Sequence, residues 1–256
     1  MIKKISIDSS SISIIEHSDK DLLNSIREII KSNFNEDTNV YSELQIEDFR
    51  QLVSSAQNQI NDFNVVQKLS LSLKAQISEY LRDNFLIQSN CYLRAARPNI
   101  SSNSENIGWH RESFYSDLGH LCYNIWTPIL GVNENNTIQY IPESQIINEN
   151  DIITENRDDS HTKKFSQGHK IGFLYSPKVI KSGVDLNKNK RLIVPNECSA
   201  IFSGNLIHGA GNNTSSEIRF SLDFRIIPKQ DYIKNKSLEK SNHFSSGKSY
   251  FIDFSE

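Results

Sequence analysis

Apolar residues recur every three or four positions up to about residue 85, which is the spacing of an amphipathic helix. Ser18 and Asp21 have the spacing of a capping box, so the first helix is predicted to begin there. No glycine or proline occurs before Pro98, which favours unbroken helices. Three segments (18–34, 42–63 and 65–85) show the pattern, with apolar faces formed by Leu22, Ile26, Ile29 and Ile30, then by Leu44, Phe49, Leu52, Val53 and Ile60, and then by Leu69, Leu73, Ile77, Tyr80 and Leu81.

From Leu86 onward, apolar and polar residues alternate in short runs, which is typical of β-strands. A helical flank followed by many short strands predicts a mainly β sandwich or barrel with flanking helices on one face. We interpret the chain as a single domain with a helical flank at 1–86, a β core at 87–228 and a C-terminal extension at 229–256. The clearest runs are 86–99, 119–129, 137–144, 169–180, 191–204 and 218–228, and all six prolines lie in this part.

Two polar stretches within the β region, 144–167 and 181–190, are predicted to be long loops. Loops of this length are usually functional or disordered, so 144–167 is either a lid over a site or a disordered segment. The polar C-terminal extension ends in the sequence YFIDF, which predicts a short edge strand.

Composition and charge narrow the class of protein. Of the 256 residues, 37% are hydrophobic, which suffices for a sizeable core. A net charge of −3 argues against a basic surface for nucleic acid or an anionic membrane. No apolar run approaches the about 20 residues of a membrane helix. Cys91, Cys122 and Cys198 form no C-x-x-C motif, so we expect free thiols and a cytoplasmic location.

The segment GWHRESFY, residues 108–115, places His110 and Glu112 two positions apart. On a strand or at its end, both side chains project to the same face, where an imidazole and a carboxylate can bind one divalent metal. The motif alone is weak, because His17 and Asp19 have the same spacing at a predicted helix start, where Asp19 is better explained as a cap. The alternative for His110 and Glu112 is an ordinary surface strand.

A second segment supplies a possible third ligand. His208 precedes a turn rich in glycine, asparagine and serine, and Arg219 and Ser221 follow on the next strand. Two histidines and one carboxylate form the facial triad of non-haem Fe(II) oxygenases. Arg219, in a mostly apolar strand, requires a carboxylate partner, which is either that of a ligand or that of a core Asp or Glu.

Taken together, these segments resemble the phytanoyl-CoA dioxygenase family of Fe(II)- and 2-oxoglutarate-dependent oxygenases, from roughly Cys91 to Pro228. WHRE resembles the W-H-x-D iron motif, and LIHGAGNNTSSEIRFSLDF resembles the H-G-S-G-x-N block with its arginine strand. IWTPILGVNENNTIQYIPESQ resembles the strand–turn–strand unit between them. Arg219 follows His208 by 11 positions (219 − 208), as is usual in this family.

The resemblance implies a double-stranded β-helix, or jelly roll, with the N-terminal helices packed on one sheet. It implies that the protein is a dioxygenase that hydroxylates a substrate while 2-oxoglutarate is decarboxylated to succinate. The implied roles are Fe(II) ligation by His110, Glu112 and His208, binding of the distal carboxylate of 2-oxoglutarate by Arg219 and Ser221, and lining of the co-substrate pocket by Trp126, Asn124 and Tyr123. For these last three residues the alternative is a half-buried position in a strand.

The sequence departs from the family pattern in three places, one at a predicted iron ligand and two at the expected edges of the pocket. Glu112 stands where most members have aspartate, and it argues against halogenation, because halogenating relatives have a small residue there. The sequence PES followed by Gln145 replaces P-G-S-H, and Ala210 stands where a serine is common.

The sequence says less about the substrate. Arg94, Arg97 and Arg111 lie around the first iron ligand. If they face the pocket, an anionic metabolite is expected; the alternative is that they are solvated. The expected partners are O2 and a small polar molecule, such as a carbohydrate, a nucleotide-sugar or an intermediate of secondary metabolism, with no nucleic acid and no membrane. The oligomeric state is left open.

Two other functions remain open. A cupin-like metalloenzyme that does not use 2-oxoglutarate predicts a third or fourth histidine ligand and no role for Arg219. A non-catalytic jelly-roll binding protein predicts no dependence on iron.

Overall fold

The computed structural model describes residues 11–34, 38–41, 43–98, 107–156, 178–239 and 249–254. Three long helices form the N-terminal part as predicted: α1 (Lys20–Phe34), α2 (Ile46–Asp62) and α3 (Val65–Leu81). The capping-box prediction for Ser18 and Asp21 is wrong. The Asp19 side chain instead accepts a hydrogen bond from the Leu22 backbone N–H at 3.0 Å, and the Ser18 hydroxyl donates to the Ser72 carbonyl at 2.8 Å.

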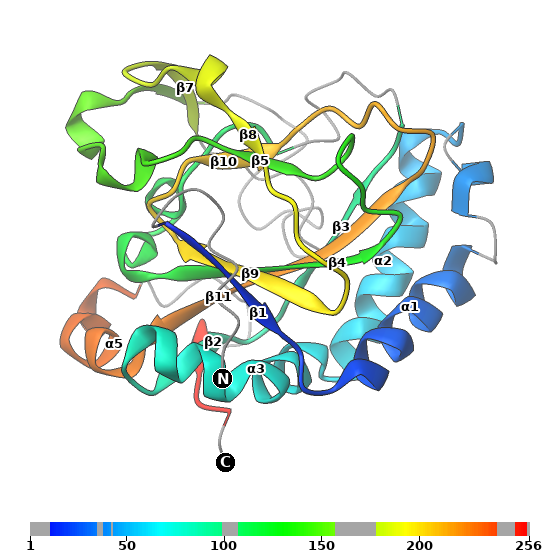
Figure 1. The fold of residues 1–256 in the computed structure, drawn as a ribbon, viewed down its shortest axis with the longest axis horizontal. Helices are drawn as coiled ribbons and strands as arrows, with labels where there is room; N and C mark the ends of the chain where they lie inside the picture. Colours follow the sequence, from blue (N-terminus) through cyan, green and yellow to red (C-terminus); the bar gives the residue numbers. More distant parts are fainter. Residues whose placement is uncertain are drawn as a thin grey trace.

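A seven-stranded sheet, called the main sheet, forms the centre of the molecule (Figure 1). Along the sheet the order is β1-β9-β4-β11-β2-β12, with β3 also paired to β11. Its strands are β1 (Ile12–Glu16), β2 (Phe85–Gln88), β3 (Tyr92–Ala96), β4 (Tyr123–Leu130), β9 (Cys198–Ser203), β11 (Arg219–Pro228) and β12 (Phe251–Ile252).

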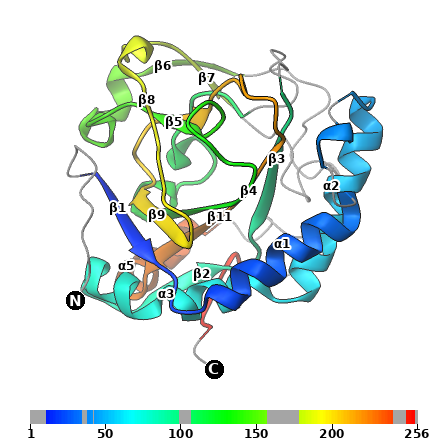
Figure 2. The same cartoon turned by 45° about the vertical axis from the view of Figure 1, so that its right-hand side comes forward.

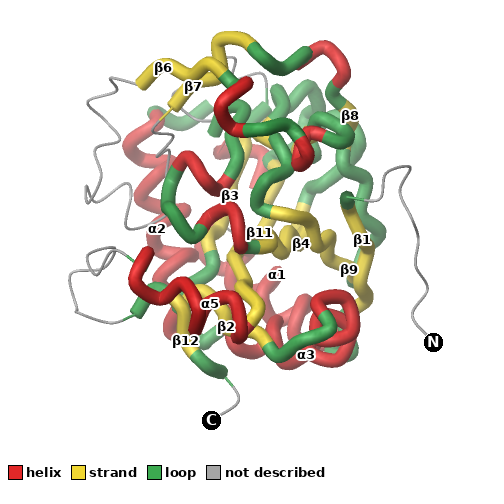
Figure 3. The backbone as a smooth tube through the Cα atoms, turned by 90° about the vertical axis from the view of Figure 1, so that its left-hand side faces the viewer, coloured by secondary structure: helices red, strands yellow, loops and turns green. Residues whose placement is uncertain are grey.

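A smaller sheet of the order β10-β5-β8 lies across the face of the main sheet that the three helices leave open (Figures 1 and 2). It consists of β5 (Ile138–Tyr140), β8 (Lys190–Arg191) and β10 (His208–Ala210). A hairpin of β6 (Ile153–Asn156) and β7 (Lys178–Ser182) lies at the end of the molecule away from α3 and β12 (Figure 3). Two antiparallel sheets packed face to face, with helices behind one of them, confirm the jelly roll.

Alternation along the strands of the main sheet separates an apolar core from a polar interior. On β11, Phe220, Leu222, Phe224 and Ile226 face the helices and join the largest core cluster, with residues from all three helices. The alternate residues of the same strand point between the two sheets. The fold therefore places a row of polar side chains inside the jelly roll.

Three elements differ from the predicted organisation, and a fourth agrees with it. Strand β1 lies within the predicted helical flank 1–86, because its pairing with β9 joins segments far apart in sequence. Strand β6 lies within the predicted loop 144–167, whose residues 157–167 are outside the described part. A short helix, α5 (Lys229–Asn235), begins the C-terminal extension. The expected edge strand near the C-terminus is present as β12, paired with β2.

His17 lies buried between the helices and the main sheet. Its Nε2 lies 2.8 Å from the Ser199 hydroxyl and its Nδ1 lies 3.3 Å from the Ser72 hydroxyl. Burial lowers the pKa of His17 to about 4, against a weaker upward effect of Asp19. The folded protein therefore holds this imidazole neutral over a range in which an unfolded chain protonates it.

This burial predicts a loss of stability in mild acid. As pH falls from 6.5 towards 4, His17 binds a proton in the unfolded state but not in the native state, so the free energy of unfolding decreases. We expect wild type to lose about 2 kcal/mol more than His17→Gln between about pH 7.5 and about pH 5. Urea unfolding at both pH values measures this, and equal losses in the two proteins would contradict it.

Among the described residues, no helix combines the length and the hydropathy that a membrane crossing needs.

Candidate metal centre and co-substrate pocket

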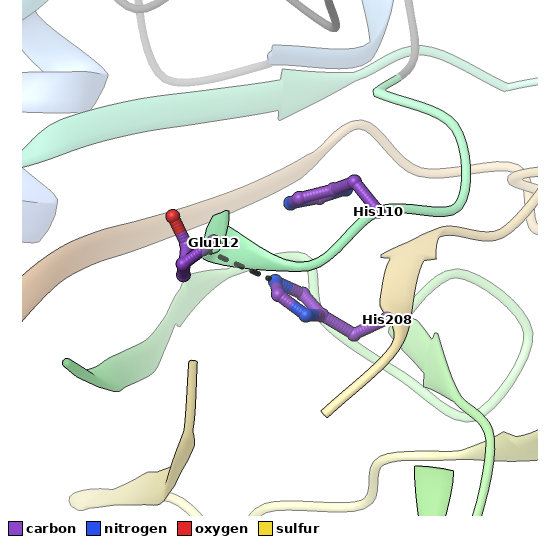
Figure 4. A group of neighbouring side chains, drawn as sticks. All are labelled: His110, Glu112 and His208. Carbon is purple, nitrogen blue, oxygen red and sulfur yellow. Dashed lines mark ion pairs between the residues drawn. The ribbon is translucent and has the colours of Figure 1, made fainter. Parts of the chain in front are cut away.

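Two histidines far apart in sequence meet at one backbone pairing. His110 and His208 form an antiparallel bridge, in which each backbone N–H donates to the carbonyl of the other, at 2.9 and 3.0 Å. Their imidazole rings lie 4.3 Å apart between centroids. The bridge brings both side chains to the same side of the paired backbone, where they point towards Glu112 (Figure 4).

Both imidazoles are oriented in the same way. The Nδ1 of His110 lies 2.8 Å from the Gly108 carbonyl, and the Nδ1 of His208 lies 2.9 Å from the Leu206 carbonyl. A carbonyl accepts only, so each Nδ1 carries the proton and each Nε2 keeps its lone pair for a metal. Burial lowers the pKa of His110 to about 3 and also lowers that of His208, so both rings are neutral at pH 7.

Glu112 supplies the third ligand atom. It begins a 3-10 turn directly after the bridge, and its backbone N–H donates to the Gly204 carbonyl at 2.8 Å. Gly204 allows this approach, because a Cβ there would lie 3.2 Å from the Glu112 Cβ and 2.4 Å from the Gly119 carbonyl oxygen. The Oε1 atom lies 3.8 Å from His208 Nε2 (Figure 4) and has no hydrogen-bond partner among the described residues.

The charge state of Glu112 suits a cation. Burial alone raises the pKa of this carboxyl, but Arg225 and the two histidines outweigh burial and lower the pKa to about 2. Arg225 Nε donates to Oε2 in a short ion pair between the partly buried arginine and the buried glutamate. One atom from each of His110, Glu112 and His208 lies within 4.8 Å of the others, so these three residues could hold a metal ion.

Arg219 lies in the wall of the same pocket, which also exposes Arg94, Trp126 and Asp223. Arg219 is 3% exposed, and its Nη1 donates to the Asn136 carbonyl at 3.1 Å. Burial lowers the pKa of Arg219 to about 10, so the side chain stays charged at pH 7. In the described part of the chain no carboxylate forms an ion pair with Arg219. This observation contradicts the alternative of a salt bridge to a core Asp or Glu.

Several hydrogen-bond donors along the paired strands β11 and β4 lack acceptors in the described structure. Arg219 Nε, Asn124 Nδ2, Trp126 Nε1 and the Ser221 hydroxyl are all buried without a partner. Asn124 and Trp126 line the pocket, and Ser221 lies on the polar face of β11 between Arg219 and Asp223. Unpaired buried donors are costly, so their concentration here indicates a ligand rich in acceptor oxygens.

Tyr123 is not brought to this pocket, contrary to prediction. Its ring lies against Tyr80 of α3, 5.7 Å between centroids, on the helix side of the main sheet. The reason is the period of two along β4, since Asn124 and Trp126 face the opposite side.

The three arginines proposed for the substrate have different environments. Arg94 lines the pocket and pairs with Asp223 through both carboxylate oxygens, at 2.5 and 3.1 Å. Arg97 lies outside it, donates to the Leu44 carbonyl and lies over the ring of Phe49.

Arg111 is also outside the pocket, and its burial has a structural reason. It donates to the carbonyls of Ser144 and Ile147, at 2.8 and 3.1 Å, and so holds the turn that follows β5. The prediction that Arg97 and Arg111 face the pocket is therefore wrong, and neither of them is solvated.

Fold and site together define a jelly-roll protein with a buried group of two histidines and one carboxylate, beside a pocket with an arginine that has no carboxylate partner among the described residues. Residues 20–221 match the family model for phytanoyl-CoA dioxygenase, so the chain belongs to this family. No curated protein sequence matches the chain.

The chain is also similar to solved structures at low identity. EvdO2 from Micromonospora carbonacea var. aurantiaca, complexed with 2-oxoglutarate, is 12% identical with a TM-score of 0.49, over 89% of this chain and 94% of that chain. The epimerase SnoN in complex with Fe3+, alpha ketoglutarate and nogalamycin RO is 12% identical with a TM-score of 0.47, over 95% and 89%. The non-heme monooxygenase ThoJ is 12% identical with a TM-score of 0.47, over 84% and 72%.

Proposed function

We propose that this protein is an Fe(II)- and 2-oxoglutarate-dependent dioxygenase formed by a single domain, and that it hydroxylates a small polar metabolite. The observation that carries the proposal is the buried group of His110, Glu112 and His208 beside the unpaired cation Arg219. Family membership supports the same assignment.

The donor set fits ferrous iron. Two neutral imidazoles and one carboxylate form a facial triad, which leaves coordination positions open for a co-substrate and dioxygen. The ligand atoms that face each other, His208 Nε2 and Glu112 Oε1, have no other role among the described contacts. In the described residues no third histidine joins the group, which favours this function over a cupin-like centre.

The pocket also fits 2-oxoglutarate. Arg219 would pair with the distal carboxylate, and the Ser221 hydroxyl would donate to the same group. Asn124 and Trp126 offer further N–H donors on the neighbouring strand. When bound, iron and 2-oxoglutarate would supply oxidation by dioxygen coupled to release of succinate and carbon dioxide.

The chain's own contribution is binding, orientation and exclusion of water. The tethered imidazoles and Glu112 fix the ligand positions before the metal arrives, and Arg219 sets the direction of the co-substrate. Apolar side chains of Ile138 and Phe202 form part of the pocket wall and limit the entry of water.

On the substrate side, Arg94 is proposed to contact an anionic group of the metabolite, because it is the one of the three arginines that lines the pocket. We expect Arg94→Gln to raise the KM for such a substrate about 10–100-fold, the effect of losing a charge-assisted hydrogen bond. The affinity for 2-oxoglutarate serves as the internal reference. Steady-state kinetics on a metabolite identified by screening measures this, and an unchanged KM would remove Arg94 from the substrate site.

The test of the proposed function is release of succinate from 2-oxoglutarate. We expect it to require Fe(II) and dioxygen, and to increase when the correct metabolite is added from a panel of sugars, nucleotide-sugars and carboxylated intermediates. Detection of the hydroxylated product by mass spectrometry distinguishes hydroxylation from epimerisation or cyclisation. A folded, iron-loaded protein that never consumes 2-oxoglutarate would favour the non-catalytic binding protein.

A further inference from the structure

The two carboxylate oxygens of Glu112 have different environments. Oε2 accepts from Arg225 Nε, whereas Oε1 lies 3.8 Å from His208 Nε2 and has no hydrogen-bond partner in the part of the chain that the structure describes. The Glu112 side chain is buried, at 2% exposure, and that of Arg225 is partly buried, at 11%. Oε2 is therefore held by Arg225, while Oε1 faces the histidines.

Arg225 is itself fixed from several directions. The Gln88 Oε1 atom accepts from both the backbone N–H and Nη1 of Arg225, at 3.2 Å each, and the Tyr250 hydroxyl lies 3.5 Å from Nη1. The rings of Tyr92 and Tyr115 lie 6.0 and 5.8 Å from the guanidinium carbon. The guanidinium is thus surrounded by side chains from β2, from β3 and from the segment that leads into β12, and these side chains restrict its movement.

A glutamate ligand has more need of such support than an aspartate. Its additional rotatable bond gives it more conformations, and ordering them costs free energy when a metal binds. The longer carboxylate can also rotate both oxygens towards the ion.

We propose that Arg225 is a positioning residue for the metal centre, which holds Oε2 of Glu112 so that Oε1 alone is presented as the third ligand. This inference rests on the metal centre of the proposed function. Arg225 lies four positions beyond the segment that matches the family model, which ends at residue 221 (225 − 221).

The test is anaerobic titration of the metal-free full chain with Co(II), followed by visible absorption. Arg225→Lys keeps the positive charge but loses the planar fork that fits a carboxylate. We expect it to weaken Co(II) binding about 10–100-fold, the usual effect of losing an outer-shell partner, and to change the absorption bands of the bound ion. Arg97→Lys is the matched control, because Arg97 is buried outside the pocket, and it should bind Co(II) as wild type does.

A double-mutant cycle separates positioning from a general effect on folding. In Glu112→Asp the shorter side chain no longer reaches Arg225 and the histidines together, so adding Arg225→Lys should cost much less than it does in wild type. Equal costs in both backgrounds would overturn the inference, as would a wild-type affinity and spectrum in Arg225→Lys.

The outcomes distinguish a failure of this inference from a failure of the proposed function on which it rests. Absence of Co(II) binding by wild type would overturn the metal centre and the inference with it, whereas an inert Arg225→Lys substitution overturns the inference alone. If Arg225→Lys does not fold, Gln88→Leu removes an anchor of Arg225 and keeps the arginine. It should weaken Co(II) binding and alter the spectrum, and wild-type values would refute the positioning role.

Discussion

Replacing His208 with alanine is expected to abolish tight metal binding and, with it, consumption of 2-oxoglutarate. The ring supplies one of three ligand atoms within 4.8 Å of one another, and its loss leaves Glu112 and His110 with an incomplete site. The affinity should fall by more than the about 10–100-fold seen when only an outer-shell partner is lost. Equilibrium dialysis with Co(II), followed by metal analysis, gives the stoichiometry and the affinity.

His120→Ala is the matched control for this substitution, because His120 is an exposed histidine outside the site. It should retain one bound metal per chain and the wild-type rate of succinate release. If His208→Ala retained both properties, the ligand assignment would be wrong, however close the three side chains lie.

The second large effect is expected at Arg219. Arg219→Ala removes the buried cation that lacks a carboxylate partner in the described structure, so the co-substrate loses its counter-charge. Removal of one member of a buried charge pair costs about 2–5 kcal/mol, so the Kd for 2-oxoglutarate should rise at least about 30-fold. Quenching of tryptophan fluorescence can follow binding, because Trp126 lines the pocket.

The chemistry of the co-substrate provides the control. 2-Oxobutyrate keeps the keto acid of 2-oxoglutarate and lacks the distal carboxylate, so wild type should bind it far more weakly. Arg219→Ala should bind the two acids with similar affinity, whereas Arg219→Lys should retain part of the preference. A variant that lacks Arg219 and still prefers 2-oxoglutarate would show that another residue binds the distal carboxylate.

The sequence could predict those site residues whose roles follow from local spacing. His110 and Glu112 share a face because they are two positions apart, and the same spacing places Ser221 beside Arg219. Strict use of the period of two would also have excluded Tyr123 from the pocket. Tyr123 is adjacent to Asn124 on the strand, so the two side chains project to opposite faces. It would have found Asp223 and Arg225, which continue the polar face of β11.

Other features depend on contacts between distant segments, and local patterns do not contain them. Arg97 and Arg111 resemble Arg94 in sequence, yet their partners are backbone carbonyls of residues 44, 144 and 147. Strand β1 is only five residues long, and it is stabilised by pairing with β9, which is far away in the sequence. Similarly, the bridge between His110 and His208 joins two segments that are far apart in the sequence.

The most direct measurement is the visible absorption of the protein after anaerobic addition of Fe(II) and 2-oxoglutarate. Wild type should develop a charge-transfer band, which requires that the keto acid chelate an iron held by the protein. The band should be absent in His208→Ala, and in Arg219→Ala it should appear only at much higher 2-oxoglutarate concentrations. A folded wild-type protein that develops no band with both additions would contradict the account.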